Sequence, residues 1–321
     1  MRRLTLLLTG VTLLTAAACG KSTTAADPAT TGAASASASQ APQATTIAGV
    51  PITADPALAG LLPDQIKSAG KVRVATEPPY APFEMFVSEG SQELTGIDVD
   101  LGHAIGAKLG VPFEFAVQKW DGIIPAIQTD QFDAVMSAMT DNKERQAVLT
   151  FVDYSVSGTG ILVKKGNPEG IAAHTDLCGK KVAAQAATNQ SKLIDKWQAD
   201  CKAAGKPAVD KKEYPKDVDI QLALKSGTVI ASLMTKPAAI YTAQTTDGGN
   251  AFQAIDDPAA MGGYNASPNG IGVANKNKQL AEAMQKALQA LIDDGSYAKI
   301  LAKYDAESIG ITTVTINAAV D

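Results

Sequence analysis

The sequence has little of several residue types on which whole classes of protein depend. It contains 3 cysteines and 2 histidines among 321 residues, and aromatic residues make up 5% of the chain. His103 and His174 lie far apart and lack the spacing of metal ligands, so we expect no metal site and no cofactor. Acidic residues outnumber basic ones by 33 to 28, which argues against nucleic acid as a partner.

Long apolar runs are missing beyond the N-terminus, so no later segment is predicted to span a membrane. The first residues, MRRLTLLLTGVTLLTAAACG, combine Arg2 and Arg3 with an apolar stretch. This pattern predicts an export signal over residues 1–18, and loss of its two arginines would change the net charge from −5 to −7. The small residues before Cys19 resemble a bacterial lipoprotein signal, in which Cys19 is lipidated. An ordinary signal peptide is the alternative.

The segment after Cys19 is poor in residues that can form a core. From Lys21 to Ala48 it has no aromatic residue and is rich in Ala, Ser and Thr. Such a composition buries too little apolar surface to offset the entropy of ordering the chain. We therefore predict a flexible linker over residues 19–57, which tethers a folded body to the membrane through the lipid anchor.

Cys178 and Cys201 are the cysteines that remain beyond Cys19. In an exported protein, an isolated pair favours one disulfide. Two free thiols or a metal-binding pair are the alternatives, although no cluster of His or Cys accompanies these residues.

The rest of the chain alternates between strand and helix patterns. In its first part, strands are predicted at 71–76, 111–118 and 132–138, and helices at 98–110 and 121–129. Asp98 is predicted to cap the first of these helices. In its second part, strands are predicted at 160–165, 180–185 and 228–234, and helices at 189–204, 217–227, 279–295 and 296–304. Strands that alternate with helices favour an α/β fold with a parallel sheet.

The stretch DAVMSAMTDNKERQ, residues 133–146, places an arginine at an unusual position. Residues 134–136 are predicted as a buried strand, 140–142 as a helix cap and 143–146 as a helix. Arg145 then lies one turn into a helix, where the backbone field is already positive. Either Arg145 is a solvated surface charge, or its guanidinium and the helix terminus bind one anion together.

Several segments, taken in order, resemble the bacterial extracellular solute-binding proteins of family 3, the polar amino-acid type that serves ABC importers. These segments are VRVATEPPYAPFEM, LTGIDVDLGHAIGAKLG, KWDGIIPAIQTDQFDAVMSAMTDNKERQ, FVDYSVSG, LCGKKVAAQAATNQ, NGIGVANK and LIDDGSYAKILAKY. The cysteine pair resembles an actinobacterial branch. The resemblance implies an α/β, two-lobed, periplasmic-binding-protein-like fold of type II with a ligand cleft between the lobes. It places lobe 1 at 58–158 and 268–321 and lobe 2 at 159–267, and it implies hinge closure around a solute.

The resemblance assigns Arg145 to the ligand carboxylate, helped by backbone at Thr140 and with Ala138 in the binding set. A helix terminus, free N–H donors and a planar guanidinium suit one anion. On the other lobe, Thr188 is predicted to cap a helix and to present further N–H donors. A purely structural cap is the alternative. The family's usual Gly-Thr-Thr or Gly-Ser-Thr is Ala-Ala-Thr at 186–188, so one hydroxyl is missing.

Glu77, Tyr80 and Trp120 match positions that line the cleft in basic and polar amino-acid binders. Glu77 can take a cationic group, and the two aromatic residues can hold an alkyl chain or stack on a cation. A core role explains Trp120 equally well by itself. Most family members have an aspartate for the ligand α-ammonium where Thr235 stands, and Thr235 alternatively caps a helix that begins near Pro237. We therefore expect a ligand with a carboxylate and a distal, substituted or delocalised cation, such as a basic amino-acid derivative, betaine or ectoine-like solute.

These features predict a monomeric, lipid-anchored receptor at the outer face of the cell membrane. It would deliver a small polar amino acid or a zwitterionic or cationic solute to the permease subunits of an ABC importer, and would not be an enzyme. Two alternatives stay open. Cyclohexadienyl dehydratases resemble the same family, and Glu77 could act as a general acid if its pKa were raised. A solute sensor for a membrane receptor would have the same features.

Overall fold

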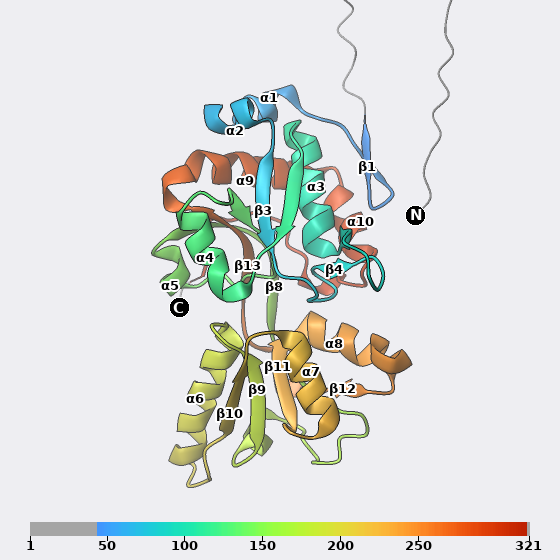
Figure 1. The fold of residues 1–321 in the computed structure, drawn as a ribbon, viewed down its shortest axis with the longest axis vertical. Coiled ribbons are helices and arrows are strands. Elements are labelled where there is room, and N and C mark those ends of the chain that lie inside the picture. The colour runs from blue at the N-terminus through green and yellow to red at the C-terminus, as the bar shows by residue number, and fades with distance from the viewer. Residues whose placement is uncertain (1–43, 320–321) are drawn as a thin grey trace, which may run out of the picture. The chain divides into compact units, whose positions relative to one another are not determined.

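Two long strands, β8 (Leu149–Lys164) and β13 (Tyr264–Ala274), run from one half of the structure into the other (Figure 1). They pair antiparallel from Leu149 opposite Ala274 to Thr159 opposite Tyr264. The predicted lobe boundaries, after residues 158 and 267, fall inside these two strands. The computed structural model describes residues 44–319. The predicted export signal and Cys19 lie outside these residues.

One sheet passes through both lobes, in the order β10-β9-β11-β8-β13-β7-β3-β6, and β12 also pairs with β8. Its other strands are β3 (Val72–Thr76), β6 (Phe113–Val117), β7 (Ala134–Val135), β9 (Lys181–Gln185), β10 (Asp210–Tyr214), β11 (Ala231–Thr235) and β12 (Phe252–Ala254). Pairing is parallel among β3, β6 and β7 and among β9, β10 and β11, and antiparallel along the crossing strands. The predicted two-lobed α/β fold is therefore confirmed.

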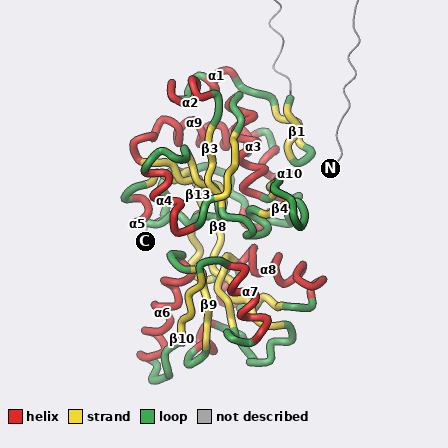
Figure 2. Tube along the Cα trace, in the orientation of Figure 1, coloured by secondary structure: helices red, strands yellow, loops and turns green. Residues whose placement is uncertain are grey.

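Lobe 1 is the half that contains β3, β6 and β7. Its helices are α1 (Pro56–Ala59), α2 (Asp64–Ala69), α3 (Ile97–Leu109), α4 (Trp120–Gln128), α5 (Lys143–Gln146), α9 (Lys278–Asp293) and α10 (Ser296–Ala302). Two small hairpins join β1 (Thr45–Ile47) to β2 (Val50–Ile52) and β4 (Met85–Phe86) to β5 (Leu94–Thr95). Loops connect these elements around the sheet (Figure 2).

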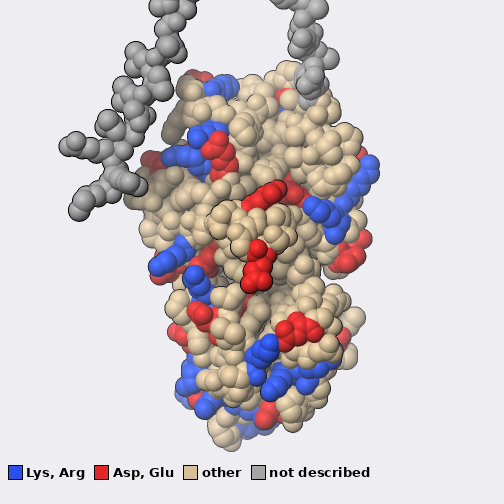
Figure 3. All heavy atoms as spheres, turned by 45° about the vertical axis from the view of Figure 1, so that its right-hand side comes forward, with Lys and Arg blue, Asp and Glu red and all other residues tan. Residues whose placement is uncertain are grey.

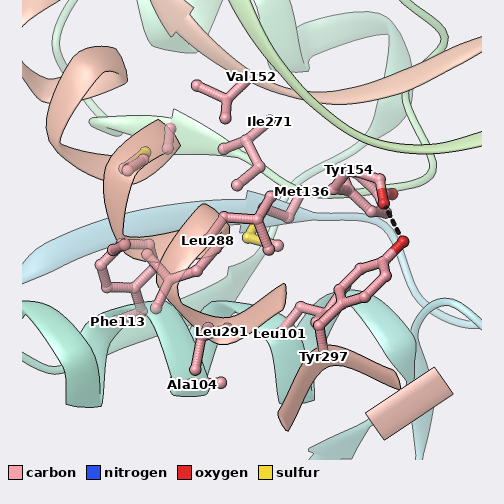
Figure 4. Close-up of a cluster of buried hydrophobic side chains, with 14 of the residues drawn as sticks. Leu101, Ala104, Phe113, Met136, Val152, Tyr154, Ile271, Leu288, Leu291 and Tyr297 are labelled. Carbon is pink, nitrogen blue, oxygen red and sulfur yellow. Dashed lines mark hydrogen bonds between the residues drawn. The ribbon is translucent and has the colours of Figure 1, made fainter. Parts of the chain in front are cut away.

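The largest core lies between the lobe 1 sheet and helices α3, α9 and α10 (Figure 4). Leu101 of α3 and Leu288 of α9 pack with Ile271 of β13, and all three are fully buried. The hydroxyl of Tyr297 donates a hydrogen bond to the backbone oxygen of Tyr154 at 2.7 Å, which ties α10 to β8. The spacing of apolar residues in the C-terminal helix predicts this buried face, and helix α9 confirms it.

Lobe 2 has helices on both faces of its sheet, so its strands are covered by two smaller cores. Helix α6 (Asn189–Ala203) packs Ile194 and Trp197 on one face. Helices α7 (Asp217–Ser226) and α8 (Lys236–Thr245) pack Ile220 and Ala238 on the other. Short 3₁₀ turns lie at His174–Leu177, Thr246–Gly249, Pro258–Ala260, Asn275–Asn277 and Glu307–Ile309.

The predicted disulfide is confirmed: Cys178 and Cys201 are bonded, with 5.6 Å between their Cα atoms. Cys201 lies near the end of α6, while the start of α6 borders the gap between the lobes. A helix of this length rises about 20 Å. The disulfide therefore fixes the end of lobe 2 away from that gap.

Two local features differ from the sequence prediction. The β1–β2 hairpin and the first two residues of α1 lie within the range predicted as linker. The hairpin is ordered because Val50 and Ile52 are buried against the lobe 1 core. Asp98 was expected to cap α3, but Gly96 is the cap residue. The Asp98 carboxylate instead accepts a hydrogen bond from the backbone nitrogen of Ala138 at 2.7 Å.

Charged side chains of both signs lie beside one another on the face shown in Figure 3. Ion pairs among the described residues include Lys108 with Asp294 and Lys180 with Glu169, each at 2.7 Å. None of the helices in residues 44–319 is long and apolar enough to cross a membrane.

Candidate functional site

A cavity lies between the lobes, where the carboxyl ends of the parallel strands of both lobes face each other. Lobe 1 lines it with Glu77, Pro78, Pro79, Tyr80, Glu84, Trp120, Ser137, Ala138, Thr140 and Arg145. Lobe 2 lines it with Gln185, Thr188, Asn189, Gln190, Lys216, Asp217, Val218, Leu233, Met234 and Thr235. All eight residues predicted to bind ligand are among these. Their role in binding stays a prediction.

Arg145 is buried at one end of the cavity, with 7% of its surface exposed. Its guanidinium donates to the backbone oxygen of Thr140 at 2.8 Å and to that of Ala187, on the other lobe, at 3.2 Å. It also lies 5.2 Å from the centre of the Trp120 ring. No carboxylate of residues 44–319 pairs with it within 4.0 Å. Burial lowers the Arg145 pKa to about 10, and the negative charges of Glu144 and Asp141 oppose this shift.

The turn before Arg145 is held by its own capping residue. The Asn142 side chain accepts a hydrogen bond from the backbone nitrogen of Arg145 at 2.8 Å, which starts the short helix α5. Gln146 donates to Asp141 at 2.8 Å. The predicted cap and helix are therefore confirmed, and of the two alternatives for Arg145 a solvated surface charge is excluded by its burial.

Glu77 and Trp120 lie between Arg145 and the part of the cavity called here the acidic end, which is lined by Glu77, Glu84 and Asp217. One carboxylate oxygen of Glu77 accepts from the backbone nitrogen of Trp120 at 2.9 Å, and the other accepts from Gln185 of lobe 2 at 2.6 Å. The indole nitrogen of Trp120 donates to the backbone oxygen of Ala187 at 3.2 Å. Trp120 therefore lines the cavity, and it also packs against the buried cluster of lobe 1 that contains Ile123 and Met139.

Thr235 and Tyr80 meet across the cavity. The Tyr80 hydroxyl accepts a hydrogen bond from the backbone nitrogen of Thr235 at 2.8 Å and lies 3.2 Å from its hydroxyl oxygen. Thr235 precedes α8 as its cap residue, but its side chain makes no capping hydrogen bond. Burial raises the pKa of Tyr80 above its usual value, so the hydroxyl stays protonated.

Thr188 and Ala138 occupy the two walls near Arg145. The Thr188 hydroxyl caps α6 by accepting from the backbone nitrogen of Ser191 at 3.1 Å, as predicted. It donates to the backbone oxygen of Gln185 at 2.7 Å. The backbone nitrogen of Ala138 is taken by Asp98, so Ala138 offers the cavity its methyl group rather than a free N–H donor.

The sequence interpretation missed two buried carboxyl groups that line the cavity, Glu84 and Asp217. One oxygen of Glu84 accepts from Ser137 at 2.6 Å, and the other has no hydrogen-bond partner among the described residues. Burial and the nearby Asp98 raise the Glu84 pKa well above its usual value. Asp217 follows the Pro215-Lys216 turn, and an acid at the start of a helix is explained by the helix dipole alone. No local signal pointed to the cavity.

The chain belongs to the bacterial extracellular solute-binding proteins, family 3, whose family model matches residues 72–307. Among curated relatives, it is 28% identical to the L-cystine-binding protein TcyJ of Escherichia coli K12 over 248 residues, covering 76% of this chain and 86% of that one.

Two solved structures show the same two-lobed fold. An ancestral arginine-binding protein bound to arginine is 35% identical, with a TM-score of 0.64 over 73% of this chain and 98% of that one. The ancestral amino acid-binding protein AncCDT-1, described as a precursor of cyclohexadienyl dehydratase, is 30% identical, with a TM-score of 0.65 over 75% and 98%.

Proposed function

We propose that this protein is the receptor of an ABC importer for a small solute of the amino-acid kind, which carries a carboxylate and a cationic group. The observation that carries this proposal is Arg145, a buried guanidinium that faces the cavity and has no carboxylate partner among the described residues. A buried charge is costly unless it is paired. A ligand carboxylate would supply that pair.

The relatives support an amino-acid ligand. TcyJ binds L-cystine, and the ancestral protein was solved with arginine. Glu77, Tyr80 and Trp120 would hold the remainder of the ligand, because they line the cavity together on lobe 1. Thr188 and Thr235 would contact it from lobe 2. Receptors of this kind bind their solute and release it unchanged.

Replacing Arg145 with alanine tests the proposal. Loss of a buried, charge-assisted pair would weaken binding of a carboxylate ligand by about 2–5 kcal/mol, or roughly thirtyfold to several thousandfold. Calorimetry with a panel of amino acids and betaines would measure this. Lys143→Ala is the matched control, since it removes an exposed cation from the same helix. Wild-type affinity in a folded Arg145→Ala variant would contradict the proposal.

A dehydratase is the second candidate, because AncCDT-1 is described as a precursor of such an enzyme. Glu84 adds weight to it, since a carboxyl with a raised pKa can remain protonated and donate a proton. Incubation with prephenate or arogenate distinguishes the two. Turnover would favour the enzyme, whereas recovery of unchanged ligand after tight binding would favour the receptor. A sensor role would differ from transport only in the membrane partner.

We further propose that a signal peptide is removed before Cys19 and that lipidated Cys19 anchors a monomer to the outer face of the membrane through the linker. Small residues before the cysteine support this. Cys19→Ser should release the protein from the membrane fraction, because no other membrane anchor is expected. Fractionation and mass spectrometry of the N-terminus would measure it, and retention of an unlipidated protein would contradict it.

A further inference from the structure

The acidic end of the cavity contains more negative charge than one ligand carboxylate and Arg145 require. Glu77 and Asp217 line the cavity together with a single buried cation, Arg145. The third acid of the lining, Glu84, has a raised pKa and is left out of this charge balance. Lys216 borders it as well, but is exposed. Carboxylates gathered in a buried site repel one another unless a positive charge compensates them.

Asp217 is the one of these acids that comes from lobe 2. It is 7% exposed and stands at the start of α7. Its Oδ2 atom accepts a hydrogen bond from the side chain of Gln221 at 2.7 Å. Its Oδ1 atom has no hydrogen-bond partner among residues 44–319. A buried carboxylate therefore faces the cavity with one oxygen available to a ligand.

Glu77 approaches the same place from lobe 1. Gln185 joins the two sides, because its side-chain nitrogen donates both to Glu77 at 2.6 Å and to the backbone oxygen of Pro215, two residues before Asp217, at 2.9 Å. The negative charge of Glu77 contributes to raising the Asp217 pKa, after burial, to about 6. Glu77 and Asp217 therefore belong to one electrostatic site that spans the gap between the lobes.

We propose that Asp217 joins Glu77, whose contact with a cationic group the family resemblance already implies, in binding an ammonium or guanidinium of the ligand, and that Asp217 makes the protein selective for that charge. This inference rests on the proposed function, in which Arg145 holds the ligand carboxylate. Trp120 separates the two ends, with its backbone nitrogen on Glu77 and its ring beside Arg145. The carboxylate and the distal cation would therefore lie along the indole.

Closure of the lobes has an electrostatic cost at this site, even though Thr235 stands where the family's usual aspartate would add a further negative charge. Bringing Glu77 and Asp217 together places two negative charges in a poorly solvated space, which opposes closure. A cation between them reverses the sign of that interaction. A neutral ligand of the same shape leaves the repulsion in place, so selectivity follows from the charge rather than from the size of the ligand.

L-arginine and L-citrulline test this, because they share the α-carboxylate, the α-amine and the chain length and differ in the charge of the distal group. In the wild type we expect arginine to bind about ten- to hundredfold more tightly. Asp217→Asn should remove most of that preference by weakening arginine binding, and should change citrulline binding little. Glu77→Gln should act in the same direction from the other lobe.

Asp219→Asn is the matched control, since Asp219 is exposed and lies two residues away in the same helical turn. It should keep the wild-type preference, and Asp217→Glu should restore part of it. Equal wild-type affinity for the two probes would overturn the inference, as would an unchanged ratio in folded Asp217→Asn and Glu77→Gln variants. In both cases the proposed function would still be supported if binding of a carboxylate ligand depended on Arg145. If no carboxylate-bearing solute binds, the proposed function fails as well.

Discussion

Thr235, beside Tyr80, shows how a single residue can decide whether the α-amine of a ligand contributes to affinity. The family resemblance leads one to expect an aspartate for an α-ammonium at 235, and this chain has a hydroxyl that lies 3.2 Å from the Tyr80 hydroxyl. A threonine hydroxyl carries no charge, so it cannot supply a charge-assisted bond. The free α-amine of a ligand should therefore contribute little to affinity at this point.

Thr235→Asp should create a preference for a free α-amine. A charge-assisted bond contributes about 1.5–3 kcal/mol, or roughly ten- to hundredfold in affinity. Calorimetry should compare an amino acid with its N-acetyl form, in the wild type and in the variant. We expect a small penalty for acetylation in the wild type and a large one in the variant. Thr235→Asn controls for shape without charge. A strong wild-type preference for the free amine would contradict this interpretation.

The role of a single residue was predictable only where that role depends on its neighbours in the sequence. The caps at Asn142 and Thr188 follow from short-range sequence patterns. Asp98 also precedes a helical pattern, but its partner is the backbone of Ala138, 40 positions away. Such long-range contacts leave no local signal, which is why the prediction for Asp98 was wrong.

Helices and strands were predictable where the hydrophobic period is clear. The apolar face of α9 and the strand patterns of β3 and β9 are regular, and the structure has these elements within a few residues of the predicted bounds. The β1–β2 hairpin was not predictable in the same way. Each strand is three residues long, and its place depends on Val50 and Ile52 reaching the core of lobe 1.

The cavity was predictable in part because one of its walls is built from continuous motifs. Glu77 and Tyr80 follow β3, and Arg145 follows β7, so sequence segments that resemble the family contain them. Asp217 lies after β10 of the other lobe, in a segment that carries no such motif. Its place at the cavity depends on how the two lobes face each other.

Contacts between the lobes extend beyond the cavity. Lys192 of α6 pairs with Glu144 of α5, and Asn142 donates to Asn189 at 2.7 Å. Both pairs join the start of α6 to the α5 helix that carries Arg145. If Arg145 binds the ligand carboxylate as proposed, closure and binding would be coupled, because the same two helix termini would take part in both. A hinge motion of the kind that the family resemblance implies would have to be absorbed in the crossing strands, which connect the two lobes.

Gly158 in β8 lies against Gly263, which directly precedes β13. The backbone nitrogen of Gly158 in β8 donates to the backbone oxygen of Gly262 at 2.8 Å. A Cβ atom added to Gly158 would lie 2.4 Å from the backbone carbon of Gly263, which is shorter than any normal contact. Gly263 itself has a φ of +91°, a conformation that favours glycine. This close approach, at the predicted boundary between the lobes, thus requires glycine at both 158 and 263.

Gly158→Ala should push β8 away from the segment that leads into β13 and change how the lobes close. Overpacking of this kind costs about 1–3 kcal/mol, which predicts a melting temperature lower by a few degrees. The open form should also be favoured, so ligand affinity falls although no cavity residue has changed. Calorimetry and small-angle scattering with and without L-arginine would measure both effects. Gly262→Ala is the matched control, because a Cβ atom there meets nothing within 4 Å. If the two variants were equally stable and compacted equally on adding ligand, the close approach of the two glycines would have no part in closure.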